Sequence, residues 1–239
     1  MIVLAIDTCD SRGGVALLRG HEIAVISAHE RGEDYSSWLL PAVDRVLKAA
    51  GVEMAEVYGY GVAAGPGSFT GVRVGLTTVK AWGEVYRKPI AAVSRLEAVA
   101  LQAGGEANYI AACLDAQRGQ VFGAVYRRNG DGLDRLGDEM VIGPGKFVAT
   151  AAEIAGSAGR IAWASTDPDC LLKLPEWQER AKRNEVVASV AGFLAGAVAR
   201  MAAKELSAGR STDALALDAN YVRRSDAEIF WKGRGAQGR

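Results

Sequence analysis

A glycine-rich run at residues 63–75 (AAGPGSFTGVRVG) limits the possible folds of this chain more than any other feature. The apolar segment before it predicts a strand over 58–64, and the apolar spacing after it predicts a helix over 70–86. Gly65 and Gly67 can adopt backbone conformations, or allow close approaches, that other residues resist. The run therefore indicates a strand that turns tightly into a helix.

This loop has two possible roles. Free N–H groups at the start of a helix can bind an anion, but glycines can equally serve to pack a strand and a helix closely. The run lacks the Gly-Lys-Ser/Thr of a Walker loop and the acidic residue about 20 positions further on that a dinucleotide site uses. Arg73 is its only cation. We therefore favour packing, with Ser68 or Thr70 capping the helix.

The composition indicates a globular chain with one large domain or two lobes. Of its 239 residues, 49% are hydrophobic and 23% are charged. The formal net charge is zero, so no broad electrostatic field attracts nucleic acid.

Cys9, Cys113 and Cys170 lie far apart in the sequence, which favours reduced thiols in the cytoplasm over a disulfide framework. The first residues, MIVLAID, predict a strand rather than a signal peptide. The longest apolar stretch, 186–199, is too short to span a bilayer.

The predicted elements form two groups, separated at Gly104-Gly105-Glu106. Each group opens with an apolar strand, an aspartate, an Arg-Gly turn and a second strand, at 4–13 and again at 112–119. Such a repeat predicts two lobes of a duplicated fold, in which a meander followed by βα units makes a mixed sheet flanked by helices. The predicted parts are a first lobe at 1–104, a second lobe at 105–222 whose last helix packs back on the first, and a mobile basic tail at 223–239.

The predicted helices are placed by apolar periodicity and by capping residues. In particular, Asn184 is expected to begin a long helix that ends near Ser207. The predicted strands are 2–8, 13–19, 23–29, 58–64, 89–93, 109–115, 119–128 and 160–165, and the predicted helices are 36–50, 70–86, 96–102, 145–155 and 184–207.

Asp7 and Asp115 end the equivalent strands of the two lobes. Facing each other across a cleft, they could hold Mg²⁺ on nucleotide phosphates, with Thr8 beside them. We favour the alternative that each aspartate caps a turn, because Cys9, Asp10 and other residues with side chains stand where a phosphate loop would want glycine. Asp7, Thr8 and Asp115 remain the candidate nucleotide-binding residues.

Other catalytic constellations are lacking. His21 and His29 are the only histidines, and both are expected to be exposed hairpin residues. A histidine-rich metal site is thereby excluded, and a histidine general base is disfavoured. Ser68 lacks the flanking glycines of a nucleophile elbow, which opposes a peptidase.

Two helices of the first lobe carry more apolar surface than a single buried face requires. Gly71 and Gly75 lie on one side of the helix at 70–86, where small residues permit another helix to come close, within the lobe or in a partner. Residues alone favour ordinary core, but a helix-bundle interface is the alternative. The residues predicted for that interface are Trp38, Leu39, Val43, Gly71, Val72, Gly75, Leu76 and Val79.

Residues 65–75, GPGSFTGVRVG, resemble the signature of the TsaB (YeaZ) family, bacterial proteins of tRNA threonylcarbamoyladenosine synthesis. The resemblance spans nearly the whole chain and is strongest over 1–120. Tyr35 departs from the family, which often has histidine there, and strand 160–165 lacks the usual glycines. Segments that agree with the family in order and spacing are Ile6–Thr8, Ser36–Pro41, Pro89–Ala98, Leu114–Gly119 and Tyr221–Arg223.

The resemblance implies the actin-like, Hsp70-like and sugar-kinase-like (ASKHA) ATPase fold. It implies a cytoplasmic subunit without a catalytic centre or a cofactor of its own, which pairs with and activates a TsaD-like catalytic subunit. The other implied partners are a TsaE-like ATPase, tRNA only through the complex, and, when the chain is alone, a second copy through helices 36–50 and 70–86. ATP and Mg²⁺ could bind at a composite site of the complex. The alternative is an ATP- and Mg²⁺-dependent ATPase or small-molecule kinase of the same fold.

Overall fold

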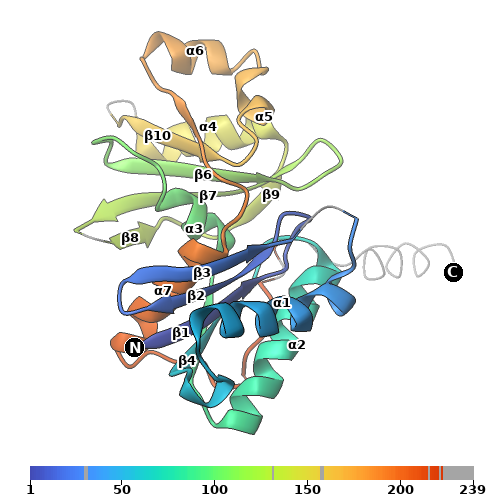
Figure 1. Cartoon of the computed structure of the whole chain (residues 1–239). Coiled ribbons are helices and arrows are strands. Elements are labelled where there is room, and N and C mark those ends of the chain that lie inside the picture. Colours follow the sequence, from blue (N-terminus) through green and yellow to red (C-terminus); the bar gives the residue numbers. More distant parts are fainter. Residues whose placement is uncertain (30–31, 131, 157–158, 215, 221, 223–239) are drawn as a thin grey trace, which may run out of the picture.

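The computed structural model describes the chain except residues 30–31, 131, 157–158, 215, 221 and 223–239. It has two lobes, each built on its own sheet, with the N-terminus in the first lobe (Figure 1). The predicted tail at 223–239, and two of the three residues in the Tyr221–Arg223 segment, lie outside the described residues.

The first lobe contains a five-stranded mixed sheet in the order β3-β2-β1-β4-β5. The first three strands form an antiparallel meander, and β4 and β5 add in parallel beside β1. The strands are β1 (Ile2–Asp7), β2 (Gly14–Arg19), β3 (Glu22–Ala28), β4 (Gly59–Ala63) and β5 (Ile90–Val93).

Helices cover both faces of this sheet. A Cβ built on Gly61 of β4 would touch Ala202 of α7, whereas one built on Gly75 of α2 would touch Val62, the next residue of β4. Because neighbouring strand residues point to opposite faces, α2 and α7 lie on opposite sides of the sheet. The helices on this sheet are α1 (Tyr35–Ala50), α2 (Phe69–Tyr86) and α7 (Ala195–Ser207), with a short 3₁₀ turn η1 (Met54–Glu56). The short helix α3 (Arg95–Ala100) follows β5 and packs into the core of the second lobe.

The second lobe repeats the plan of the first. Its sheet has the strand order β8-β7-β6-β10-β11, in which the first three strands are again antiparallel and the last two parallel. The predicted duplication is therefore confirmed. The elements are β6 (Tyr109–Asp115), β7 (Val121–Asn129), β8 (Gly132–Arg135), β9 (Met140–Ile142), α4 (Pro144–Ala155), β10 (Ile161–Ser165), α5 (Asp169–Leu172), α6 (Trp177–Lys182) and β11 (Val187–Ser189).

The predicted helix from Asn184 to Ser207 is wrong over its first half. Asn184 has a positive φ of 56°, and Val187–Ser189 is the strand β11, paired in parallel with β10. Glu185 is buried, where it accepts a hydrogen bond from Trp163 Nε1 at 2.8 Å and pairs with Arg180. Pairing with β10 overrides the local helical pattern, so the helix begins only at Ala195.

The glycine-rich loop packs against the chain itself, as favoured from the sequence. A Cβ on Gly67 would lie 2.3 Å from the carbonyl oxygen of Cys9, and one on Gly71 would lie 2.0 Å from that of Thr8. The N–H of Ser68 donates to the Cys9 carbonyl at 2.6 Å, and the Ser68 side chain caps α2 by accepting from Gly71 N. The segment that follows β1 thus occupies the space at the N-terminal end of α2.

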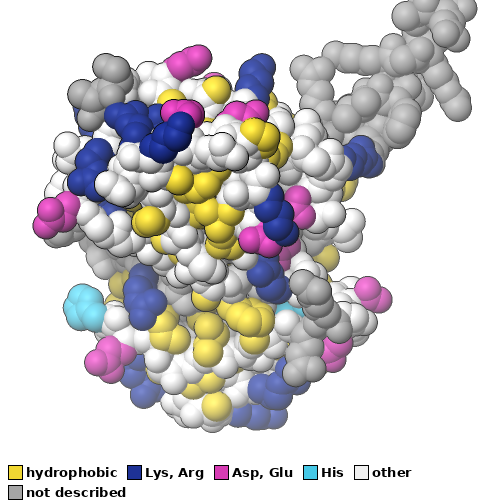
Figure 2. Space-filling view, turned by 90° about the horizontal axis from the view of Figure 1, so that it is seen from above, with side chains coloured by type: hydrophobic (Ala, Val, Ile, Leu, Met, Phe, Trp, Pro, Cys, Tyr) yellow, Lys and Arg dark blue, Asp and Glu magenta, His cyan; other side chains and the backbone are white. Residues whose placement is uncertain are grey.

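One face of the molecule carries mixed charge. On the face shown in Figure 2, lysine and arginine side chains are interspersed with aspartate and glutamate around small hydrophobic patches. Among the described residues, none of the helices combines the length and the apolar character needed to cross a membrane.

Replacing Gly71 with valine should destabilise the fold by about 1–3 kcal/mol, because the new side chain cannot avoid the Thr8 carbonyl. The gain in helix propensity, at most about 1 kcal/mol, is the smaller effect. Urea denaturation measures the difference in the free energy of unfolding. Gly104→Ala is the control, since nothing lies within 4 Å of a Cβ there. Equal stability of the two variants would contradict the packing role of the loop.

Candidate functional site

The eight residues predicted for a partner interface lie inside the first lobe. Leu39 is 2% exposed and Val79 is fully buried, and Gly75 faces Thr8 and the sheet rather than a second helix. In the single chain these residues belong to the core that holds the helices on the sheet, and Leu39 also lines the groove on their outer side. The eight buried residues are Trp38, Leu39, Val43, Gly71, Val72, Gly75, Leu76 and Val79.

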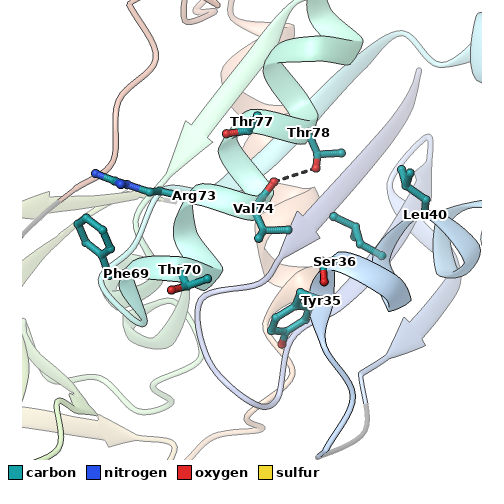
Figure 3. A pocket seen from close by; sticks show the side chains of 10 residues that line it. Tyr35, Ser36, Leu40, Phe69, Thr70, Arg73, Val74, Thr77 and Thr78 are labelled. Carbon is teal, nitrogen blue, oxygen red and sulfur yellow. Dashed lines mark hydrogen bonds between the residues drawn. The ribbon is translucent and has the colours of Figure 1, made fainter.

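The outer sides of the same helices form a groove of about 490 Å³. Figure 3 shows side chains of α1 and α2 facing each other across it. Leu40 is 58% exposed and Phe69 38% exposed, and the guanidinium of Arg73 lies 3.8 Å from the centre of the Phe69 ring. The lining residues are Tyr35, Ser36, Leu39, Leu40, Phe69, Thr70, Arg73, Val74, Thr77 and Thr78.

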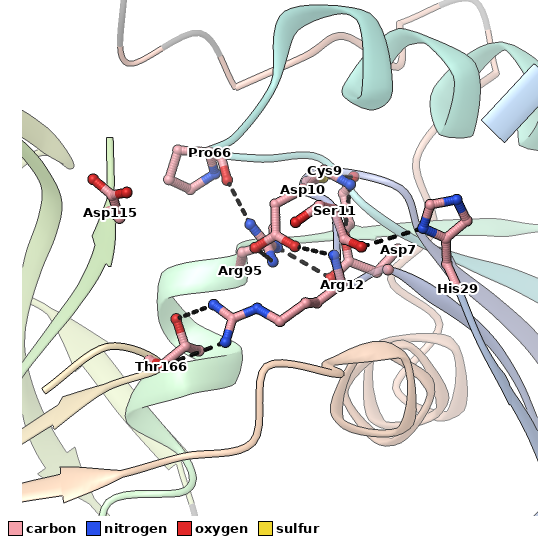
Figure 4. A network of polar contacts seen from close by, with 12 residues as sticks. Asp7, Cys9, Asp10, Ser11, Arg12, His29, Pro66, Arg95, Asp115 and Thr166 are labelled. Atoms are coloured by element: carbon pink, nitrogen blue, oxygen red, sulfur yellow. Dashed lines mark hydrogen bonds and ion pairs between the residues drawn. The ribbon is translucent and has the colours of Figure 1, made fainter. Parts of the chain in front are cut away.

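A second set of polar residues lies at the end of β1, on the side of the second lobe (Figure 4). Asp7 is completely buried, and both oxygens of its carboxylate are engaged. Oδ1 accepts a hydrogen bond from the N–H of Cys9 at 2.9 Å, and Oδ2 accepts one from Nε of Arg95 at 3.1 Å. Asp7 caps a turn, as favoured from the sequence, and also holds a buried cation.

Arg95 is the centre of this cluster. The guanidinium is buried and also donates to Asp10 Oδ2 at 2.7 Å and to the carbonyl of Pro66 at 3.3 Å. Burial would lower the pKa of Arg95, but the charges of Asp7 and Asp10 outweigh it and raise that pKa. The same pairing holds the pKa of the Asp10 carboxyl below its ordinary value of 3.8, although burial acts in the opposite direction.

Arg12 extends the cluster to the second lobe. Its N–H donates to Asp10 Oδ1 at 2.6 Å, and its guanidinium donates to the side chain and the carbonyl of Thr166, at 3.3 and 3.5 Å. Figure 4 shows Arg12 reaching from the loop after β1 to Thr166, which follows β10. The first lobe is therefore fastened to the second beside the buried ion pairs.

The expectation of two exposed histidines is correct for His21 and wrong for His29, which is 4% exposed. His29 stacks on Tyr35 with ring centroids 4.0 Å apart, and its ring nitrogens lie 3.2 and 2.9 Å from the carbonyl oxygens of Ser11 and Glu33. Tyr35 in turn donates to the carbonyl of Asp10. The stacked rings of His29 and Tyr35 pack against the loop after β1. Both ring nitrogens of His29 contact backbone carbonyl groups, so neither is free for acid–base catalysis.

The carboxylates at the ends of β1 and β6 do not fit a Mg²⁺ site. Asp7 is neutralised by Arg95, and Asp115 is exposed and accepts hydrogen bonds from the backbone and side chain of Gln117 at 2.7 and 2.6 Å. The hydroxyl of Thr8 donates to the carbonyl of Gly71 at 2.6 Å. Among the described residues, no group of three or more His, Cys, Asp or Glu side chains could hold a metal ion.

Sequence reasoning missed Arg95, Asp10, Arg12 and Thr166. One signal was present: Arg95 directly follows Ser94, a residue that caps the start of α3. A cation is disfavoured in the first turn of a helix, so an arginine there indicates a specific acidic partner. The sequence does not show which aspartate is this acidic partner. Asp7 and Arg95 are 88 residues apart and come together only when the sheet forms.

The duplicated mixed sheets, with their helices and the loop-filled end of β1, define a two-lobed α/β protein. A family profile described as "TsaD: tRNA N6-adenosine threonylcarbamoyltransferase" matches residues 28–167. The chain belongs to the TsaB (YeaZ) family, as the resemblance in its sequence implied.

Three relatives illustrate this membership. The chain is 36% identical over 131 residues to the tRNA threonylcarbamoyladenosine biosynthesis protein TsaB of Bacillus subtilis, covering 54% of this chain and 57% of that protein. It is 31% identical over 137 residues to TsaB of Escherichia coli, covering 56% and 58%. These alignments span less than two thirds of either relative. A crystal structure of an uncharacterised Pseudomonas aeruginosa protein "with similarity to peptidase YEAZ" has a TM-score of 0.76 and 26% identity, covering 93% of this chain and 99% of that one.

Replacing Arg95 with methionine should destabilise the fold by about 3–5 kcal/mol, because it leaves the buried carboxylate of Asp7 without its counter-charge. The double variant Asp7→Asn/Arg95→Met should recover part of this loss, since no buried charge then remains unpaired. Urea denaturation of both variants and of Asp7→Asn tests the coupling. Additive losses would contradict it.

Asp10 should make stability depend on pH in the acid range. Because the pKa of this carboxyl is lower in the folded state, its stabilising effect is complete above about pH 5 and disappears as the pH falls through the folded-state value. The variant Asp10→Asn should therefore lose stability at neutral pH and show a shallower decline between about pH 5 and pH 2. Thermal melts across this range measure the slope. An unchanged slope would contradict the pairing with Arg95.

Proposed function

We propose that this chain is a non-catalytic subunit of the complex that makes N6-threonylcarbamoyladenosine in tRNA. It pairs with a TsaD-like catalytic subunit and activates that subunit. The names of its TsaB relatives, and the TsaD description of the matching family profile, support this pathway.

The groove between α1 and α2 carries the proposal. Its floor and walls are apolar at Leu39, Leu40 and Val74, while hydroxyl groups of Thr70 and Thr77 line its edge. Such a surface fits the ridge of a partner helix, with a few large apolar contacts supplying most of the binding energy. When the partner is absent, a second copy of this chain uses the same groove, so the homodimer and the heterodimer exclude each other.

The cluster around Arg95 supports a subunit without chemistry of its own. The carboxylate that an ATPase of this class would turn toward a metal ion is buried and neutralised by an internal cation. In this proposal, activation comes from contact: α1 and α2 hold a catalytic subunit in its competent arrangement. A TsaE-like ATPase and tRNA join through the assembled complex, and any ATP and Mg²⁺ bind at a composite site rather than in this chain alone.

Leu40→Asp should weaken binding to the TsaD-like subunit of the same organism by at least about tenfold, because it places a charge on the exposed apolar surface of the groove. The fold should be retained, since Leu40 is 58% exposed. Calorimetry measures the dissociation constant, and the yield of the modified nucleoside with the partner present should fall in parallel.

Leu172→Asp is the matched control, since Leu172 is 45% exposed on the second lobe. It should leave both binding and nucleoside yield unchanged. Val79→Asp, by contrast, should lose folded protein because Val79 is fully buried. Unaltered pairing of the Leu40 variant, or an equal loss in the Leu172 variant, would remove the groove from the proposal. Turnover by the isolated chain would overturn its non-catalytic role.

A further inference from the structure

Two cysteines that are far apart in the sequence meet in the second lobe. Sγ of Cys113, on β6, lies 3.8 Å from Sγ of Cys170, on the short helix α5. The hydroxyl of Ser165 lies 3.8 Å from Cys170 on another side. The third cysteine, Cys9, is buried in the first lobe, where its thiol donates to the carbonyl of Ala63 at 3.3 Å. The fold thus brings together two of the three thiols.

The two thiols of this pair differ in access and in acidity. Cys113 is completely buried in a central strand, whereas Cys170 is partly exposed. The hydrogen bond from Cys113 lowers the pKa of Cys170, while that bond and burial raise the pKa of Cys113. An accessible, more acidic thiol beside a protected second thiol is the arrangement of a peroxide-reactive cysteine and its resolving partner.

We propose that Cys170 and Cys113 are a modification site at which hydrogen peroxide converts the two thiols into a disulfide. The Cys170 thiolate attacks one peroxide oxygen, the O–O bond breaks, and the released hydroxide takes a proton to become water, leaving Cys170 as a sulfenic acid. Cys113 then loses its proton and attacks Sγ of Cys170. The S–S bond forms, the S–O bond breaks, and a second water leaves. The two sulfurs have together given two electrons to the peroxide.

The geometry permits this step because one partner can move. The sulfurs must approach by roughly 1.8 Å to reach a disulfide bond length. Cys113 is held in β6 between β7 and β10. Cys170 lies outside the sheet, on α5, a four-residue helix in the connection between β10 and α6.

The same connection carries the contact between the lobes. Thr166 lies four residues before Cys170. Its carbonyl and hydroxyl oxygens accept hydrogen bonds from the guanidinium of Arg12 in the first lobe. The hydroxyl of Ser165 accepts the N–H of Asp167 at 3.0 Å and so shapes the turn between them. A disulfide that draws α5 toward β6 therefore acts on the segment that receives Arg12. This inference does not depend on the proposed partner.

The test treats the reduced, full-length chain with hydrogen peroxide and follows intact mass and disulfide-linked peptides. The wild type should lose two hydrogen atoms and yield a peptide linking Cys113 to Cys170. Cys113→Ala should instead accumulate a sulfenic acid at Cys170, trapped by dimedone, and Cys170→Ser should leave Cys113 unoxidised. Cys9→Ser is the control and should form the link at the wild-type rate.

Circular dichroism of each reduced variant establishes that it is folded before oxidation. Three results would overturn the proposal: the absence of the Cys113–Cys170 peptide when peroxide has consumed Cys170, linkage through Cys9, or equal dimedone trapping in the wild type and in Cys113→Ala. Hydrogen exchange of the wild type, reduced and oxidised, should change in the segment 165–172, and an unchanged segment would overturn the coupling to the contact between the lobes.

Discussion

The buried guanidinium of Arg95 ties together parts of the chain that are remote in sequence. It contacts the carboxylate at the end of β1, Asp10 in the following loop, and the carbonyl of Pro66 in the glycine-rich run. Removing a guanidinium from water is costly, and the cost is offset only because charged and neutral acceptors surround it. The same residue begins α3, whose apolar side chains Leu96 and Val99 belong to the core of the second lobe. One side chain thus links the first sheet, the glycine-rich loop and the second lobe.

The two copies of the duplicated unit have diverged at this position. Asp7 and Asp115 end β1 and β6, the equivalent strands, and each accepts a hydrogen bond from the backbone N–H two residues further on. In the first lobe the turn is covered by the glycine-rich run and by Arg95. In the second lobe the turn is exposed, and the side chain of Gln117 donates to the carboxylate. Sequence similarity between the strand ends therefore marks common topology, and the surroundings decide whether the carboxylate meets a cation.

The fold could be predicted from the sequence where local signals agreed with tertiary packing. The glycine-rich run, Ser68 as the cap of α2 and the repeated Asp-to-Gly turns all gave correct expectations. The prediction was wrong where a long-range contact overrode a local pattern, as at Asn184, because β10 draws residues 187–189 into its sheet. The site was harder to predict. Apolar periodicity identified α1 and α2 correctly, but it did not separate residues that face the sheet, such as Val72, from residues on the outer surface. Apolar spacing marks chiefly the side of a helix that packs on the core.

The buried cluster and the groove divide the first lobe into an inward and an outward side. The end of β1 is filled by Arg95 and by the backbone of the glycine-rich run. Filling it fixes the start of α2, because Gly71 lies against Thr8 and Ser68 against Cys9. A helix fixed in this way presents Phe69 and Val74 at a constant position beside α1. A preformed surface loses less entropy when a partner binds. The interactions that close the inner site therefore also prepare the outer groove for docking.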